Sequence, residues 1–506
     1  MFKRHSLVRF TILVAILIPT TIFSLETNIR GKIIDSNNNP LPKVNIYTTN
    51  SGTESIEDGT YILNVDENSV VTFSHIGFNT LSFISNKIPY PVVLHSKLIT
   101  GKEVIVKAGF KSQSLDKTPA SITLINKNEL RRKSENHFQA LIDNIPNLNY
   151  SSGTSRPRYF QIRGIGERSQ YVGEGAPNFS VGFMVDGIDF SGIGMAGMLF
   201  DTEQIEVFKG PQSSIYGPNA MAGLINITTA NPTPFFTGNS IISIGTDNLQ
   251  TYGLALGGPI KNNLTYRFAF QKHSQDGFRN NIYRNLTNSN KKNEFFLRTK
   301  FNWSVSKNIN VQFLYFNANL KNGYDAWAVD NNENFNTYTD EQGMDSQKSM
   351  SNSIKINYNS NGVIALYQLT KSEHEMEHSY DGDWANNDYW LESPYNFDPY
   401  KFYDKTIRNR DNFSHTFRVS FNFNPILEIT TGIHLDNISE NDIAEGWLFG
   451  GDATSVVSNF DIYNRSIYSQ ANLLISERFS ISLNLRNEHN TTKYSSTGEN
   501  GDWDVY

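Results

Sequence analysis

The stretch "IEVFKGPQSSIYGPNAMAGLINITT", residues Ile205 to Thr229, decides the fold of this chain. Its glycines and prolines separate short strand-like runs, which is typical of tight turns and of close approaches between backbones. The stretch lacks the G-K-[ST] ending of a phosphate-binding loop, so we interpret its glycines as structural. Three further motifs precede it in the chain: "HFQALIDNIPNL" (137–148), "FQIRGIGERSQ" (160–170) and "SVGFMVDGIDFSG" (180–192). The first of these has apolar residues at helical spacing.

Taken together, the four motifs resemble the plug domain of TonB-dependent outer-membrane receptors, and we place an α+β plug domain at residues 114–232. The motif residues are Gly164, Asp186, Gly187, Gly210, Pro211, Tyr216 and Gly217. The resemblance implies that Arg163 and Lys209 act as plug cations that pair with barrel acids, because buried charges need partners. The lysine departs from the arginine that is more usual in the family. In an alternative reading, Arg163 bonds only within the plug.

The segment "GIGMAG", residues 192–197, fits the dinucleotide pattern G-x-G-x-x-G. A dinucleotide site needs a long helix after these glycines and an acidic residue about 20 positions further on. The Gly210-Pro211 pair breaks such a helix, and the acidic residue is missing. We therefore reject a nucleotide site.

The third region, residues 240–506, alternates apolar and polar residues with a period of two. Phe413, Phe417 and Phe421 alternate with polar neighbours, and "LTYRFAFQ" (264–271) and "FSISLNLR" (479–486) do the same. Aromatic-rich strands that are apolar outside and polar inside are the signature of a transmembrane β-barrel. A soluble barrel or sandwich is the alternative. Short turns alternate with long connections, which we assign to the extracellular side: 275–292, 320–350, 376–411 and 438–460.

We count about eleven strands in this region, whereas a closed bacterial barrel needs an even number. The final "TGENGDWDVY" reads as loop. The expected architecture is therefore mainly β: an N-terminal β-sandwich, a plug, and about 11 strands of a transmembrane antiparallel barrel. The resemblance implies that these strands are the first half of a barrel of about 22 strands. On this reasoning the chain is expected to be a C-terminally truncated piece of a longer receptor.

The beginning of the chain indicates export. Lys3, Arg4 and Arg9 precede an apolar run that is too short to span a bilayer, so residues 1–24 are predicted to be a signal peptide. Residues 28–98 read as short strands between turn formers and resemble the carboxypeptidase-regulatory-like domain found ahead of many such receptors. Residues 101–110 follow, and their segment Glu103, Val104, Ile105 and Val106 resembles the TonB box. An extended segment of this kind can add to the sheet edge of a partner. The alternative is a last strand of the sandwich.

The motif H-E-x-x-H occurs at His374, Glu375 and His378. In a helix these histidines could share a zinc ion, but the segment continues the strand that follows "NSNG" and leads into a loop near Met376. Extended backbone separates the two histidines by roughly 13 Å. We therefore expect no zinc protease and no metal site. Import without hydrolysis, which the resemblance implies, needs no catalytic residue, and we identify none.

The chain has no cysteine and a formal net charge of −6, which argues against disulfide chemistry and nucleic-acid binding. The resemblance implies an outer-membrane receptor, embedded in lipid, that imports a scarce nutrient such as a ferric siderophore with energy from the periplasmic TonB protein. No cofactor is expected. Candidate ligand contacts lie in the plug and in aromatic loops, although belt or loop packing explains each ring equally well: Glu167, Arg168, Gln170, Tyr171, Tyr324, Trp327, Tyr380, Trp384, Tyr389 and Trp390.

Two alternative functions remain open from the sequence. The first is a SusC-like oligosaccharide importer, a class that also carries the N-terminal sandwich but pairs with a surface lipoprotein. The second is a surface adhesin or passive pore with a vestigial plug, which would work without proton-motive force. A likeness of fold alone does not separate these functions.

Overall fold

The structure is a computed structural model. It describes residues 26–96, 105–106, 110, 113–133, 136–151, 153–170, 172, 179–193, 198–392, 394, 401–424, 426–447, 456–476, 479–497 and 503–505. The proposed signal peptide at 1–24 lies outside these ranges, as do Glu103 and Val104. The chain divides into two compact units, Met1–Glu103 and Val104–Tyr506, which are described separately.

The first unit is a small β-sandwich, as the sequence predicted. One sheet has the order β4-β1-β7, and the other has the order β3-β2-β5-β6. Alternating residues of both sheets, including Ile33, Ile46 and Phe73, are fully buried between them. The elements are β1 (Glu26–Asp35), β2 (Asn45–Tyr47), β3 (Gly52–Glu54), β4 (Thr60–Asp66), β5 (Val70–Ser74), β6 (Leu81–Ile84), η1 (Ser85–Lys87) and β7 (Val92–Leu94).

The second unit begins with a plug built on a five-stranded sheet of order β10-β15-β16-β13-β14. Its β-elements are β8 (Ile105–Val106), β9 (Gln113–Ser114), β10 (Ile122–Asn126), β11 (Leu148–Tyr150), β12 (Phe160–Ile162), β13 (Val181–Val185), β14 (Ile188–Asp189), β15 (Thr202–Lys209) and β16 (Gly223–Thr229). Its helices are η2 (Leu115–Lys117), α1 (Lys127–Lys133), η3 (Phe138–Asn144), α2 (Ser213–Tyr216) and η4 (Pro218–Ala220).

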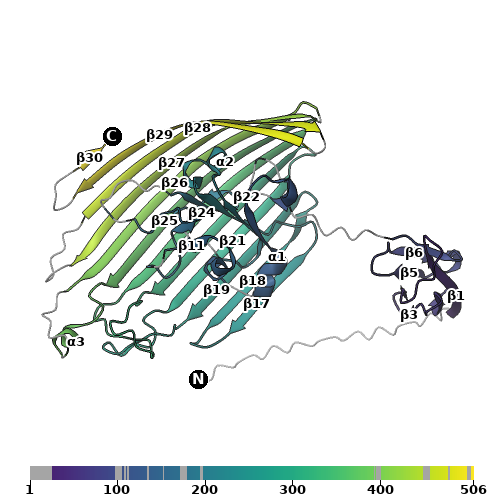
Figure 1. The fold of residues 1–506 in the computed structure, drawn as a ribbon, viewed down its shortest axis with the longest axis horizontal. Coiled ribbons are helices and arrows are strands. Elements are labelled where there is room, and N and C mark those ends of the chain that lie inside the picture. Colours follow the sequence, from purple (N-terminus) through teal and green to yellow (C-terminus); the bar gives the residue numbers. More distant parts are fainter. Residues whose placement is uncertain are drawn as a thin grey trace, which may run out of the picture. The chain divides into compact units, whose positions relative to one another are not determined.

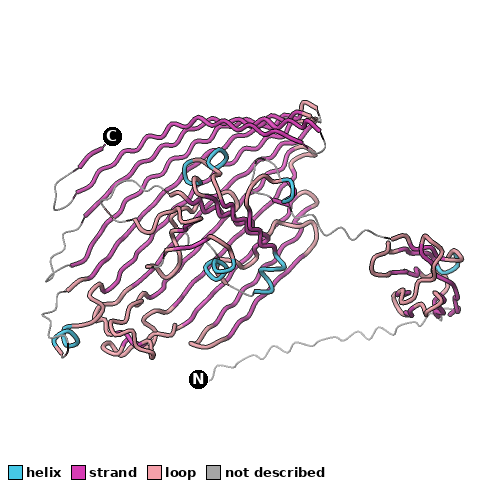
Figure 2. The backbone as a smooth tube through the Cα atoms, viewed as in Figure 1, coloured by secondary structure: helices cyan, strands magenta, loops and turns pink. Residues whose placement is uncertain are grey.

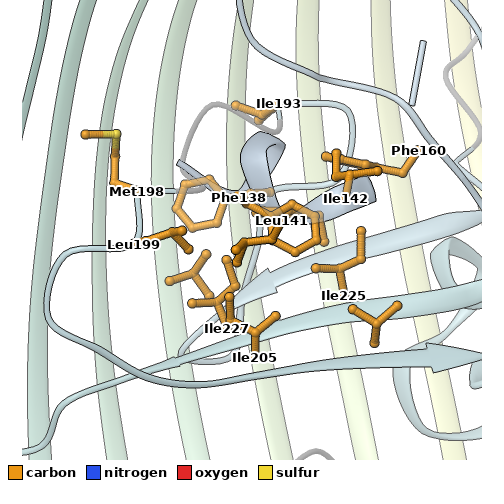
Figure 3. Close-up of a cluster of buried hydrophobic side chains, with 14 of the residues drawn as sticks. Phe138, Leu141, Ile142, Phe160, Ile193, Met198, Leu199, Ile205, Ile225 and Ile227 are labelled. Atoms are coloured by element: carbon orange, nitrogen blue, oxygen red, sulfur yellow. The ribbon is translucent and has the colours of Figure 1, made fainter. Parts of the chain in front are cut away.

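The plug core gathers around the segment that the sequence predicted to be amphipathic. This segment forms the 3₁₀ helix η3 and buries Phe138, Leu141 and Ile142. Figure 3 shows these side chains directed toward Ile205, Ile225 and other apolar residues of the plug sheet. Each fully buried side chain of this size contributes roughly 1.5–3 kcal/mol. The core therefore makes the plug a packed domain inside the second unit.

Twelve strands of the described residues form one antiparallel sheet in which each member pairs with the next member along the chain (Figures 1 and 2). Its members are β17 (Thr237–Ile244), β18 (Gln250–Lys261), β19 (Leu264–Gln275), β21 (Lys292–Ser304), β22 (Ile309–Gly323), β24 (Met344–Ser360), β25 (Val363–Asp381), β26 (Tyr403–Asn422), β27 (Leu427–Trp447), β28 (Val456–Ser476), β29 (Phe479–Thr497) and β30 (Trp503–Val505). The connections also carry β20 (Asn280–Asn281), β23 (Asn336–Thr337) and α3 (Asn387–Leu391).

Alternation along these strands matches the predicted faces. Phe413, Phe417 and Leu483 are exposed on the outer face, whereas Arg267 and Gln271 are buried on the face that holds the plug. This confirms the antiparallel barrel-type sheet. Among the described residues, no helix is long and apolar enough to cross a membrane.

Two features of the large sheet differ from the expectation: the number of its strands and the end of β25. The described residues place twelve strands in the large sheet instead of about eleven, because residues 503–505, read as loop, form β30 and pair with β29. β25 also runs on to Asp381, whereas we expected a loop from about Met376. Its upper part stays paired with β24 and β26 although its side chains are polar, since backbone ladders extend a strand regardless of side-chain polarity.

Candidate functional site

The plug and the loop end of the sheet enclose a cavity of about 400 Å³, which we call the loop-side cavity. The end of the sheet that carries the long connections forms one side of it. The plug lines the cavity with Ser151, Gly153, Thr154, Arg158, Tyr159 and residues 168–170. A volume of this size suits a small-molecule ligand.

One wall of the loop-side cavity is aromatic. The ring centroids of Trp327 and Trp384 lie 5.9 Å apart, so two separate loops bring the indoles together. The Tyr324 ring meets His378 edge-on at 4.7 Å and Tyr380 at 6.3 Å. Trp327 and Trp384 remain about half exposed, which leaves their faces open to a ligand.

Three guanidinium groups also line the cavity, two from the plug and one from β26 of the sheet. Arg158 and Arg408 line the cavity while each is fixed by a buried carboxylate, and Arg168 is exposed. Arg408 bonds both oxygens of Asp442 at 2.7 Å and donates to the Tyr159 hydroxyl at 3.2 Å. A rigid, planar guanidinium held in this way favours flat or anionic ligand groups.

The structure brings six of the ten candidate ligand contacts to this one cavity. These are Arg168, Gln170, Tyr324, Trp327, Tyr380 and Trp384. Glu167 is used differently, because its carboxylate accepts from the backbone nitrogen and hydroxyl of Ser180. Tyr171 lies outside the described residues, and Tyr389 packs on Tyr338 at 4.8 Å.

Sequence reasoning missed Arg158, Tyr159 and Arg408 as cavity residues. Their only signal was a pair of arginines just before a plug strand, "SRPRYF" (155–160), and an arginine on the inner face of β26. It also missed the pairing that holds them. The Arg158 guanidinium contacts Asp345 Oδ1 at 2.5 Å, and the nitrogen and hydroxyl of Ser155 both donate to Asp345 Oδ2 at 2.6 Å.

A second plug arginine anchors the plug to the sheet just beside this cavity. Arg156 donates through Nε and Nη2 to the two oxygens of Glu294, each at 2.7 Å. Asn322 donates to the same carboxylate and to the Ser155 hydroxyl, both at 2.9 Å. The pair is almost completely buried, so each charge depends on the other for solvation.

At the other end of the plug, the plug supplies the acidic partner of each ion pair and the sheet supplies the basic one. Asp201 of the plug accepts from Arg267 and lies 3.6 Å from Arg298, both on the sheet. Asp186 accepts from Lys300 Nζ at 3.0 Å and from Thr229. Burial alone raises the pKa of Asp186, but the Lys300 and Arg298 charges outweigh it and hold the pKa below its usual value.

The plug motif residues lie in turns of the plug, and Asp186, Gly187 and Tyr216 also line a second cavity between the plug and the sheet. Asp186 and Gly187 both have positive φ, at 52° and 83°, and form the two-residue turn between β13 and β14. Gly164, Gly210 and Gly217 also have positive φ. Tyr216 ends α2, after the Gly210-Pro211 turn.

The proposed lock residues do not meet a sheet carboxylate within the described part of the chain. Arg163 is exposed, and Lys209 Nζ donates to Thr123 Oγ1 of the plug at 3.0 Å. Their pairing with barrel acids stays a prediction.

The described half of the TonB-box-like segment lies against the plug. Ile105 and Val106 form β8, which pairs with β9, and Gln204 Nε2 donates to the Ile105 carbonyl at 2.9 Å. Val106 is buried beside Phe208 and Leu224. The segment is therefore extended, as strand addition to a partner requires, but it is already paired.

The H-E-x-x-H segment lies within β25, so its expected extended conformation is confirmed. His374 is buried and bonds to the Ser349 hydroxyl at 2.8 Å, whereas His378 lines the loop-side cavity. Within the described residues, no group of three or more metal-binding side chains is placed to share an ion.

Comparison with known proteins agrees with this geometry. Residues 114–224 match the family described as TonB-dependent Receptor Plug Domain. The chain is 28% identical over 159 residues to the vitamin B12 transporter BtuB of Vibrio vulnificus, a match covering 30% of this chain and 24% of that protein. It is 27% identical over 166 residues to the pesticin receptor of Yersinia pestis, covering 32% and 24% respectively.

Among solved structures, the ferric yersiniabactin uptake receptor FyuA from Yersinia pestis is similar, with a TM-score of 0.66 at 16% identity. That alignment covers 76% of this chain and 59% of FyuA. The ferripyoverdine-binding FpvA of Pseudomonas aeruginosa aligns with a TM-score of 0.61 at 14% identity, covering 78% of this chain and 54% of FpvA. The matches thus span about a quarter of the curated relatives and little more than half of the solved receptors.

Proposed function

We infer that this chain, which its plug domain and barrel-type fold identify as a TonB-dependent receptor of the bacterial outer membrane, serves the active import of a ferric siderophore or a similar metal chelate. The matched family and its structural neighbours are transport receptors rather than enzymes. The single observation that carries the cargo proposal is the loop-side cavity, which is lined by indoles and tyrosines together with guanidinium groups.

The chemistry of that cavity fits a chelate. A metal chelate presents flat, often aromatic donor groups and frequently a net negative charge. Aromatic rings bind the flat faces by stacking, and the guanidinium groups of Arg158, Arg168 and Arg408 attract negative oxygens. Recognition by shape and charge needs no covalent step, so we propose that the chain has no catalytic residue and no cofactor.

Energy for import is proposed to come from the periplasmic TonB protein. The segment Glu103–Val106 would add as a strand to this partner, and traction on it would displace the plug. The extended conformation of Ile105 and Val106 supports this step. The matching short turns of the sheet would face the periplasm, which puts the loop-side cavity toward the cell exterior.

The proposal is tested with a panel of radiolabelled ferric chelates, cobalamin and maltooligosaccharides. The 506-residue chain is expressed in cells that lack their own receptors for these compounds, and both binding and uptake are measured. We expect saturable binding of a chelate and uptake that stops when an uncoupler collapses the proton-motive force. Selective uptake of an oligosaccharide would replace the cargo proposal, and uptake that is indifferent to the uncoupler would reject active import.

A further inference from the structure

A second cavity, of about 440 Å³, lies between the plug and the sheet; we call it the turn-side cavity. Its wall residues Gln312, Asn357 and Leu366 lie within a few positions of the short turns that join β21 to β22 and β24 to β25. It is thus on the opposite side of the plug from the loop-side cavity. One residue that lines it, Phe110, comes from the short segment between β8 and β9.

The Phe110 ring packs against an aromatic ring and a guanidinium group of the cavity wall. The ring stacks on Tyr468 of β28 with centroids 5.1 Å apart and planes 4° apart. The guanidinium of Arg418 on β26 lies 5.3 Å from the centroid of the same phenylalanine ring. Arg486 of β29 in turn lies 5.7 Å from the centre of the Tyr468 ring.

The strand register of the sheet brings the residues around the Phe110 ring to one level. Arg418 is directly opposite Gly432 of β27, Gly432 is opposite Tyr468, and Tyr468 is opposite Arg486. Four neighbouring strands therefore present an Arg-Gly-Tyr-Arg row at one level. A Cβ atom at Gly432 would lie only 2.5 Å from the Tyr468 ring, so the absence of a side chain there lets the tyrosine lie flat and offer its face.

We propose that this row, Arg418-Gly432-Tyr468-Arg486, is a seat for Phe110 and that the seated ring is a latch on the TonB-box-like segment. β8 and β9 are only two residues long each, so strand pairing alone holds the segment weakly. Stacking of Phe110 adds a fixed point on the wall. A partner that engages β8 and draws the segment away must also pull Phe110 from its seat. The role of the latch in energy coupling rests on the proposed function, but its existence does not.

Trypsin reports on the latch, because Lys107 and Lys111 flank Phe110 in the sequence. The 506-residue chain, purified in detergent micelles so that both ends of the sheet are accessible, is digested briefly, and cleavage after these two lysines is followed by mass spectrometry. When opening is fast relative to cleavage, the rate follows the population of the open form. We expect Phe110→Ala to accelerate cleavage about tenfold, because one stacked ring pair and one cation–π contact are lost.

Matched variants distinguish the loss of ring stacking from the effect of a smaller side chain. Phe110→Leu keeps an apolar side chain and should accelerate cleavage nearly as much as Phe110→Ala, whereas Phe110→Tyr should remain within about twofold of the parent chain. Gly432→Ala should reproduce the effect from the wall, with the segment itself unchanged. Phe278→Ala is the control, because Phe278 also lies beside a guanidinium and a second ring but in a long connection.

The outcomes are distinct. Cleavage of Phe110→Ala at the parental rate, or equal acceleration by Phe278→Ala, would overturn the latch. A second measurement adds the purified periplasmic domain of TonB, which should bind Phe110→Ala more tightly than the parent chain by about the factor seen in cleavage. If cleavage accelerates but TonB binds neither chain, the latch stands and the proposed energy coupling fails.

Discussion

Replacing Glu294 with glutamine should leave Arg156 as a buried cation without a counter-charge. The pair makes two hydrogen bonds of 2.7 Å, and the exposed fractions of its side chains are 6% for Arg156 and 0% for Glu294. Removal of one partner from such a pair typically costs about 3–5 kcal/mol, mostly from the stranded charge. We therefore expect Glu294→Gln to lower the free energy of plug unfolding by about 3 kcal/mol.

A urea titration with a probe on the plug measures this change. Because the chain has no cysteine, an Asn128→Cys substitution on the exposed side of α1 can carry an environment-sensitive dye alone. The double variant Arg156→Met with Glu294→Leu removes both charges, so it should stay within about 1 kcal/mol of the parent chain. The reasoning would be refuted if Glu294→Gln cost no more than the double variant.

A matched control uses an exposed ion pair of similar length. Glu375 and Lys348 are 2.8 Å apart, but their side chains are 65% and 64% exposed. Water solvates both ions after the partner is lost, so Glu375→Gln should change the unfolding free energy by less than about 1 kcal/mol. Equal losses in Glu375→Gln and Glu294→Gln would show that burial is not the cause.

Three further outcomes are expected. Trp384→Ala should weaken binding of the chelate identified in the panel about tenfold, measured by equilibrium dialysis, because one stacking face is lost; unchanged affinity would contradict the site. Gly187→Ala should destabilise the plug by about 1–3 kcal/mol, since φ is positive there and the new Cβ would lie 2.9 Å from Gln368; parental stability in the urea titration would contradict the strained turn. Asp186→Asn should cost about 3 kcal/mol at pH 7, because it strands Lys300. The lowered pKa of Asp186 means that its stabilisation is present above the unfolded pKa of about 4 and is lost as the pH falls through the folded pKa. The gap between variant and parent should therefore narrow in acid, and a gap independent of pH would be inconsistent with an ionised Asp186.

The sequence predicted which face of each strand is buried, because the period of two assigns faces without reference to other strands. Arg267 and Gln271 lie on the predicted inner face for this reason. The predicted ends of the strands were less accurate than the predicted faces. The polar upper part of β25 and the short β30 are held by backbone ladders, whose hydrogen bonds leave no mark in side-chain polarity.

The candidate site likewise contains residues that the sequence named and residues that it missed. Aromatic residues concentrated in two long connections made Trp327 and Trp384 candidate ligand contacts, and the structure places both at the loop-side cavity. Their contact with a ligand stays a prediction. The guanidinium groups of the cavity were missed, because Arg158 and its partner Asp345 are 187 positions apart and only the folded structure brings them together. Composition predicts that buried charges will be paired, but it does not say which acid meets which base.

The plug and the sheet each supply one member of every anchoring pair, with Arg156 on the plug facing Glu294 on the sheet and Asp201 on the plug facing Arg267. Neither partner can change its charge alone without stranding an ion. Substitutions at such positions should therefore be inherited together, as charge swaps or as joint apolar replacements, while the exposed Lys348 and Glu375 vary independently. Coevolution across related chains would then trace the contact surface between plug and barrel in sequence data alone.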